Sequence, residues 1–162
     1  GGHTAEFLLT HPVSRTRIAA AKLAALAVMI LALNAACAAC GLGSILGIGE
    51  EPVWGDLLKY HGMQLLMQLE IGGICFGLSS LLRRSSYGLA IGAAMGLYFL
   101  GIFINMDTSL EPLRFVTPYY YADAARVFAG EPLADAVAAG CGLGALGAAF
   151  SLWRYGRKDI AA

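Results

Sequence analysis

The pattern of apolar positions divides the chain into four long hydrophobic stretches separated by polar segments. The stretches cover about residues 23–48, 60–82, 87–104 and 133–153. A helix rises about 1.5 Å per residue, so each stretch is about long enough to cross a hydrocarbon layer of roughly 30 Å. The sequence therefore predicts an all-α membrane protein with four transmembrane helices in a single transmembrane domain, residues 1–162.

Two polar segments between these stretches predict different structures. Residues 48–59 contain Pro and Gly and predict a short loop. Residues 105–132 are long enough to fold on their own, and Thr117-Pro118 predicts the start of a helix that ends at Gly130. This helix is expected to lie on or dip into the membrane interface, as an aromatic anchor or as a lid over a substrate path. The aromatic residues that favour this location are Phe115, Tyr119, Tyr120, Tyr121 and Phe128.

Composition and charge agree with a membrane protein and add an orientation. Hydrophobic residues make up 58% of the chain and charged residues 14%, and the mean hydropathy is +0.66, outside the range of ordinary globular domains. One side of the predicted membrane carries Arg15, Arg17, Lys22, Arg83, Arg84, Arg154, Arg157 and Lys158, and the other carries only Lys59, Arg114 and Arg126. By the positive-inside rule both termini are cytoplasmic, in a plasma or inner membrane. The zero net charge gives no reason to expect nucleic-acid binding.

Glycines recur at four-residue spacing within the hydrophobic stretches, which allows helices to approach closely in lipid. The longest such ladder comprises Gly88, Gly92 and Gly96, and we expect it to form a helix contact, either within the chain or with a second copy. Other pairs at this spacing are Gly43 with Gly47, Gly73 with Gly77, and Gly140 with Gly144.

Glu70 is the one carboxylate well inside a hydrophobic stretch. An ionised group there costs about 2.5–3.5 kcal/mol on insertion scales, so Glu70 is expected to be protonated, paired or in contact with water. One interpretation is that Asn34, Gln68 and Glu70 line a transport pathway. The other is that Glu70 makes an interhelical hydrogen bond to Asn34 or Ser79.

Four cysteines raise the alternative of a membrane thiol-disulfide oxidoreductase. Cys37 and Cys40 form a CxxC motif whose thiols share one face of a helix. Their alanine-rich surroundings favour packing as small apolar residues. The three histidines are scattered and form no metal-ligand set with the cysteines.

The chain contains no phosphate-binding loop, because no Gly precedes any of its three lysines. No histidine is suitably placed to activate a serine nucleophile. We therefore expect neither an enzyme nor a cofactor site in this chain, and any ATP and Mg²⁺ that it uses must be bound by a partner subunit.

The polar segment before the first hydrophobic stretch has the features of a contact element. Phe7, Leu8 and Leu9 give a short apolar surface with Glu6 at its edge. Pro12 disfavours helix at the residue before it and so separates this piece from the membrane helix. A short helix held at an angle to a membrane helix can transmit a push from a partner, whereas a plain interfacial anchor is the simpler alternative.

The run GHTAEFLLTHPVSR, followed by Lys22, resembles the stretch before the third transmembrane helix in permeases of type-two ATP-binding cassette (ABC) exporters. In that family the stretch forms or adjoins the cytoplasmic coupling helix, which meets the ATPase subunit. The LSSLLRRSS turn, the TPYYYADA segment and the C-terminal RYGRKDI extend the resemblance, and His3 departs from it. The resemblance implies ATPase coupling by Thr4, Glu6, Phe7, Leu8, Leu9, Pro12, Val13, Ser14 and Arg15.

The resemblance also implies partners and a larger protein. A separate ABC ATPase subunit and a second permease subunit, in a homo- or heterodimer, are expected to assemble with this chain in the lipid bilayer. The chain begins Gly-Gly without Met. We expect a C-terminal fragment that contains the third to sixth helices of a six-helix permease.

Overall fold

A computed structural model describes residues 15–81 and 87–157 of the chain. The secondary-structure elements of the described part are all helices. They are α2 (Arg15–Gly47), α3 (Trp54–Leu81), α4 (Tyr87–Met106), the 3-10 helix η1 (Thr108–Phe115), α5 (Ala124–Ala129) and α6 (Ala134–Arg157). Four of these helices, α2, α3, α4 and α6, are long and apolar enough to cross a membrane. The predicted all-α membrane fold is confirmed.

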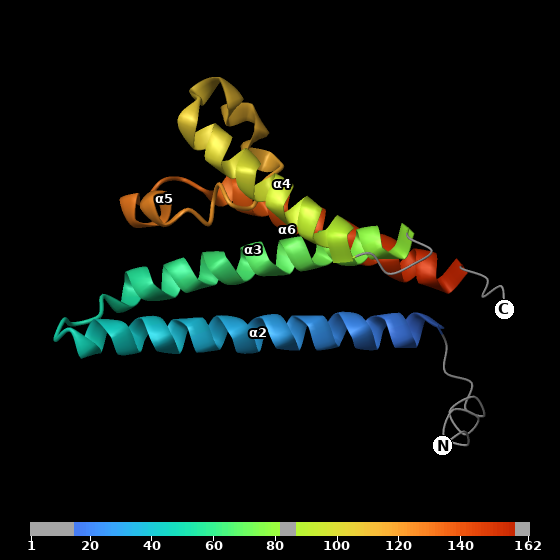
Figure 1. Cartoon of the computed structure of the whole chain (residues 1–162), viewed down its shortest axis with the longest axis horizontal. Coiled ribbons are helices and arrows are strands. Elements are labelled where there is room, and N and C mark those ends of the chain that lie inside the picture. The colour runs from blue at the N-terminus through green and yellow to red at the C-terminus, as the bar shows by residue number, and fades with distance from the viewer. Residues whose placement is uncertain (1–14, 82–86, 158–162) are drawn as a thin grey trace, which may run out of the picture.

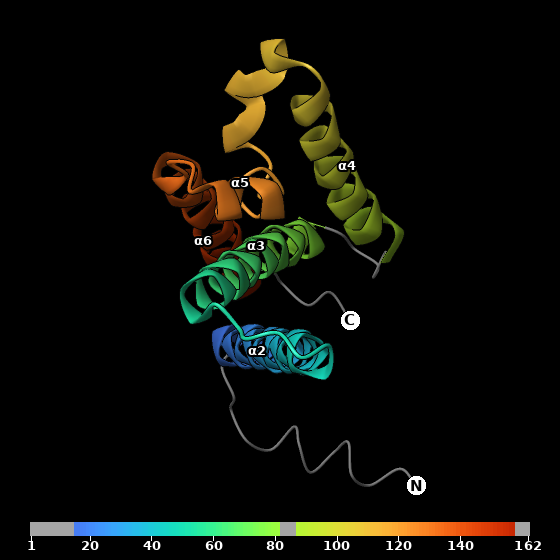
Figure 2. The same ribbon diagram turned by 90° about the vertical axis from the view of Figure 1, so that its left-hand side faces the viewer.

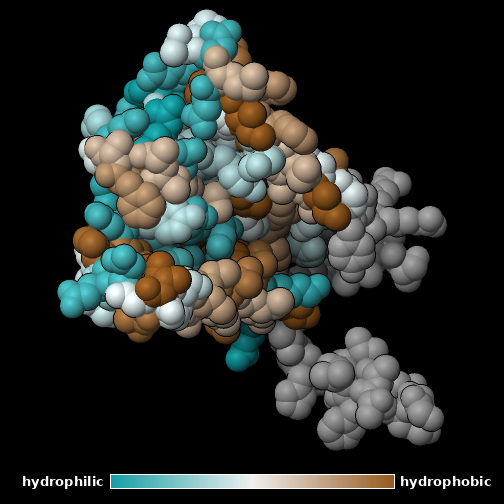
Figure 3. Space-filling model, turned by 60° about the vertical axis from the view of Figure 1, so that its left-hand side comes forward, coloured by the Kyte–Doolittle hydropathy of each residue, from teal (hydrophilic) through white to brown (hydrophobic). Residues whose placement is uncertain are grey.

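The long helices run in alternating directions (Figure 1). One end of the molecule, here called the basic end, contains the start of α2, the end of α3, the start of α4 and the end of α6. The opposite end contains the α2–α3 loop and the cap segment, defined as residues 107–133. Figure 3 turns this second end forward and shows hydrophilic side chains gathered over it.

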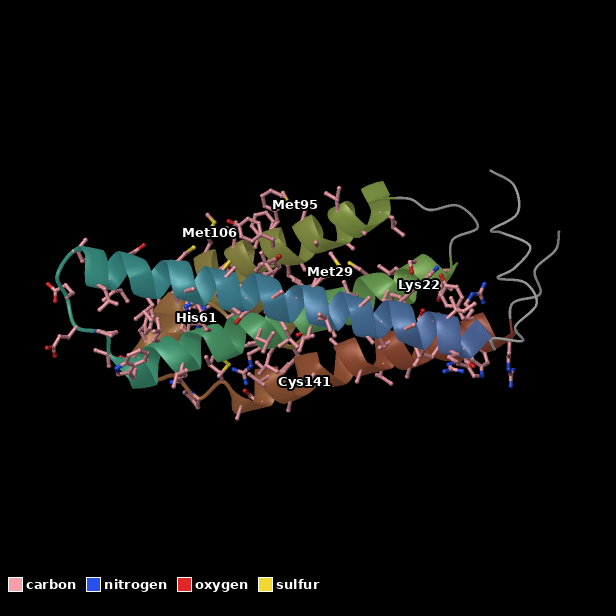
Figure 4. All side chains as sticks on the ribbon, turned by 90° about the horizontal axis from the view of Figure 1, so that it is seen from below. Lys22, Met29, His61, Met95, Met106 and Cys141 are labelled. Carbon is pink, nitrogen blue, oxygen red and sulfur yellow. The ribbon has the colours of Figure 1, made fainter. Side chains whose placement is uncertain are left out.

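Helix α3 packs most closely against α6, and α2 packs against both (Figure 2). Helix α4 stands to one side and is connected chiefly to η1 and α3. Met95 and Met106 of α4 lie at the edge of the bundle (Figure 4), with exposed side chains. Because lipid tails solvate apolar side chains, such exposure is expected on a membrane helix.

Helices α2 and α3 extend furthest beyond the hydrophobic stretches that predicted them. Helix α2 starts at Arg15, eight residues before the expected span, because polar residues can continue a helix into the headgroup layer. Helix α3 starts at Trp54, so the loop expected at 48–59 is shorter. Gly55 does not break the helix in its first turn, where Asp56 is favourably placed at the helix N-terminus.

The cap segment differs from the single helix that was expected from Thr117 to Gly130. It contains two short helices, with Thr117 in the connection between them. The second begins after Asp123, whose carboxylate accepts a hydrogen bond from the Arg126 N–H. It ends, as predicted, at Gly130, whose φ of +72° is in the left-handed region that glycine tolerates.

Candidate functional site

Glycines bring α3 and α6 into backbone contact in the second half of α3. A Cβ atom at Gly77 would lie 2.9 Å from the Gly147 carbonyl oxygen, and one at Gly73 would overlap the Gly144 carbonyl. This is the close approach that small residues allow in lipid. By contrast, Gly92 of the favoured ladder has no atom within 4 Å of its Cβ position in this chain, and neither does Gly96. The within-chain contact is therefore made by other glycines.

The same contact buries Glu70. Its side chain lies against Gly140 and its Cα lies 2.8 Å from the Cβ position of Gly144, and only 2% of the residue is exposed. Any side chain larger than Gly at position 140 would collide with the carboxylate. The glycines of α6 thus provide the space that Glu70 occupies.

Tyr121 of the cap segment binds Glu70. The tyrosine hydroxyl donates a hydrogen bond of 2.8 Å to Glu70 Oε2, and the ring is 1% exposed. Glu70 Oε1 is buried and has no hydrogen-bond partner among the described residues.

This contact corrects two predictions. The interhelical bond expected from Glu70 to Asn34 or Ser79 is wrong, because the Asn34 amide donates to the His61 carbonyl and the Ser79 hydroxyl to the Phe76 carbonyl. The aromatic residues were all expected to suit the interface, yet Tyr120 and Tyr121 are packed inside the protein and do not offer their rings to the headgroups. Phe115 and Phe128 do remain exposed.

Three hydrogen bonds attach the cap segment to α3, at successive positions towards the basic end. Lys59 Nζ donates to the Val127 carbonyl at 3.2 Å, Gln64 Nε2 donates to the Ala122 carbonyl at 2.9 Å, and Glu70 accepts from Tyr121. The three α3 residues cover about 16 Å along the helix axis at about 1.5 Å per residue. The segment therefore enters the bundle and reaches the middle of α3.

Arg126 stabilises the cap segment from within. Its guanidinium donates to Glu131 Oε2 at 2.7 Å, to Asn105 Oδ1 at 2.9 Å and to the Tyr120 hydroxyl at 3.1 Å. It also lies 4.1 Å from the centre of the Tyr120 ring, a favourable cation–π distance. These contacts connect α5 to the end of α4 and to the residues before α6.

Arg114 attaches η1 to α6. Its guanidinium lies 2.6 Å from Asp135 Oδ2 and 3.0 Å from Glu111 Oε1. With Lys59 and Arg126, all three cations at this end of the bundle have partners within the chain.

The structure does not bring the three predicted pathway residues into one site. Asn34 lies on α2 and contacts α3 at His61, about two and a half turns from Glu70. Gln68 is partly buried, and its Oε1 has no partner among the described residues. Only Glu70 meets the cap segment. Tyr121 was missed as a site residue, because no sequence spacing relates it to Glu70, 51 positions away.

The predicted coupling residues Thr4, Glu6, Phe7, Leu8, Leu9, Pro12, Val13 and Ser14 lie outside the described residues. Arg15 is the first residue of α2. The cysteines are free thiols, and Cys141 lies on α6 (Figure 4). No group of three or more His, Cys, Asp or Glu side chains within residues 15–81 and 87–157 could hold a metal ion.

Comparison with known proteins gives one result. The sequence matches the family described as ABC-2 family transporter protein over residues 2–160. No curated protein and no solved structure matched the chain.

Proposed function

Because the chain belongs to the ABC-2 family of transporter proteins, we propose that it is the permease subunit of an ATP-driven exporter, coupled to a separate ATPase subunit. Membership of the family makes it a multi-pass membrane component of an ABC transporter. The observation that carries the proposal is the extent of the match, residues 2–160, which includes the polar segment before α2 as well as all four long helices. Neither the match nor the described cysteines give support to a thiol oxidoreductase.

The ATPase is proposed to bind at the basic end, through residues 4–15. The described cations Arg17, Lys22, Arg154 and Arg157 lie on the parts of α2 and α6 at this end. The positive-inside rule places such an end in the cytoplasm, where an ATPase subunit would meet it. A push on the segment before α2 would then move a continuous helix of 33 residues as a rigid body.

The cap segment is proposed to be the gate at the opposite end. Its hydrogen bonds to Lys59, Gln64 and Glu70 support this role, since they hold the part of the segment after η1 against α3, where Tyr121, Ala122 and Val127 are buried. Glu70 would lie at the inner limit of the closed gate. Opening would break the Tyr121 contact and expose a carboxylate to the pathway.

A second permease subunit, identical or related, would complete the transporter. Helix α4 supports this part of the proposal, because it stands apart from α2 and α6 and because the Cβ positions of Gly92 and Gly96 on it have no atom of the described residues within 4 Å. Such a small-residue face lets a helix of a partner approach closely.

Affinity purification of the full-length protein from its native membrane tests the assignment. We expect an ABC ATPase subunit in the purified complex, ATP hydrolysis by that complex, and loss of the ATPase when residues 4–15 are deleted. A transporter that works without any ATPase subunit would overturn the proposal. Export, as opposed to import, requires ATP-dependent uptake into inside-out vesicles that carry the complex.

A further inference from the structure

A slot opens between α2, α3 and α6 within the membrane-spanning part of the bundle. Its volume is about 240 Å³. Every residue that lines it is apolar or glycine, including Leu23, Leu26 and Ile30 of α2, Gly72 of α3, and Ala145 and Ala148 of α6. No side chain in the lining can therefore hydrogen-bond to water or to a polar solute.

The slot exists because α2 contacts its neighbours on either side of it. Toward the basic end, Ala19 is buried and Thr16 approaches Gly156, whose Cβ position lies 3.1 Å from Thr16 Cγ2. Toward the other end, Asn34 donates its hydrogen bond to His61. Between these contacts, small residues of α3 and α6 face α2, so the helices enclose a space that their own side chains do not fill.

The dimensions of the slot fit a hydrocarbon chain. The slot follows residues 23–30, about 10 Å along the helix axis. That length fits within one leaflet, which is half of a hydrocarbon layer of about 30 Å.

A cation lies where the slot meets the basic end. Lys22 immediately precedes Leu23 and is one helical turn before Leu26 on the same face. Figure 4 shows it toward the beginning of α2, with Met29 further along the helix. Its side chain is exposed, no carboxylate among the described residues pairs with it, and helical side chains extend toward the N-terminus, here the headgroup layer.

We propose that the slot is a binding site for an anionic phospholipid, with one acyl chain between α2, α3 and α6 and the phosphate at Lys22. The apolar side chains of the lining disfavour a polar ligand, the length of the slot suits an acyl chain in one leaflet, and the charge at the slot end selects an anion. The lipid would fill the gap between α2 and the α3–α6 pair.

Native mass spectrometry of the purified full-length protein tests the site, with dioleoyl phosphatidylglycerol and dioleoyl phosphatidylcholine as probes. We expect phosphatidylglycerol to be retained in preference. Lys22→Gln should reduce this preference about fivefold, the factor for one basic residue near an anionic surface. Arg157→Gln is the matched control, because it removes a charge from the same end, at a residue near the end of α6 that stacks on Trp153 and is not adjacent to a residue of the slot.

Two variants test the acyl chain. Ala148→Phe fills the slot and should lower retention of both lipids at least tenfold, since each excluded methylene group is worth roughly fourfold. Gly72→Ala is milder, because its Cβ would meet only the flexible ends of Ile30 and Leu26, and it should lower retention in the same direction. Ala25→Phe, at an exposed residue of α2 outside the slot, should retain lipid.

Three results would overturn the proposal. They are equal retention of the two lipids by the wild type, undiminished retention by both Ala148→Phe and Gly72→Ala, and a change in subunit association without a change in retained lipid. The last of these would assign the slot to another protein chain.

Discussion

The Tyr121 hydroxyl donates a 2.8 Å hydrogen bond to Glu70 Oε2, across 51 positions of sequence. The bond connects the cap segment to the middle of α3, at the place where Gly140 and Gly144 of α6 leave room for the carboxylate. One contact thus joins the packing of the bundle to the segment proposed as the gate.

Removal of the hydroxyl should weaken the cap segment. Tyr121→Phe leaves a buried carboxylate without its donor, and we expect a loss of about 1–3 kcal/mol in the free energy of unfolding. Thermal unfolding in detergent should show it as a decrease in Tm of about 2–4 °C for each kcal/mol lost. Tyr119→Phe is the matched control, because the Tyr119 hydroxyl makes no hydrogen bond to the described residues. Equal Tm values for the two variants would show that the bond contributes nothing.

Glu70→Gln separates the role of Glu70 in folding from its role in transport. The amide oxygen can still accept from Tyr121, so we expect the variant to fold with nearly the wild-type Tm. Transport should change, because the ionisable group at the inner limit of the gate is lost. The measurement is the transport rate across pH in proteoliposomes. Rates that match the wild type at every pH would contradict a pathway role.

Two glycines of α6 should respond oppositely to substitution. A Cβ at Gly147 would lie 2.5 Å from the Gly73 carbonyl oxygen, whereas a Cβ at Gly142 would have no atom within 4 Å. Gly147→Ala should therefore destabilise the protein by about 1–3 kcal/mol through overpacking. Gly142→Ala should be neutral or stabilise by up to about 1 kcal/mol, because Ala favours helix. Similar Tm values for both would mean that α3 and α6 are not in backbone contact.

A disulfide can hold the cap segment against α4. The Cβ position of Gly101 lies 2.9 Å from Tyr119 Cβ, slightly closer than the roughly 3.5–4.5 Å that a disulfide requires. In a background with the four native cysteines replaced by Ser, the pair Gly101→Cys and Tyr119→Cys should cross-link and block transport. A reductant should restore transport in the cross-linked double variant. It should have no effect on transport by either single variant. Undiminished transport by the cross-linked protein would show that the segment need not move away from α4.

Charge reversal should uncouple the proposed ATPase contact. We expect Glu6→Lys and Arg15→Glu to reduce the transport driven by each ATP hydrolysed while the protein still reaches the membrane, because the partner surface would meet the wrong charge. The ratio of transport to hydrolysis in the assembled complex is the measurement. Normal ratios in both variants would leave residues 4–15 as a membrane anchor.

Replacing Cys37 and Cys40 tests the alternative function, a thiol-disulfide oxidoreductase. Cys37→Ser with Cys40→Ser should leave transport unchanged, because both thiols are free and exposed on α2. Loss of activity in this double variant, with normal abundance in the membrane, would instead support thiol chemistry.

The sequence by itself determined the membrane class, the four long helices and the family. These follow from properties that are local along the chain: the length of the hydrophobic stretches, and a family pattern that extends over residues 2–160. The predicted ends of the helices were less accurate, because a helix continues past the edge of the hydrocarbon layer wherever polar residues permit it.

Only the tertiary structure decided which small residues and which polar residues meet. The glycine pairs Gly73 with Gly77 and Gly140 with Gly144 have the same spacing as the ladder in α4, yet these pairs, with Gly147, form the α3–α6 contact, whereas Gly92 and Gly96 meet no other described helix within 4 Å. Likewise, sequence identified Glu70 as exceptional but placed Tyr121 at the headgroup level. Four-residue spacing of glycines predicts a helix face without side chains, but not which helix packs on it. A tyrosine hydroxyl can find a hydrogen-bond partner either at the membrane interface or inside the protein. The choice depends on which surfaces lie opposite, and that is a property of the folded bundle.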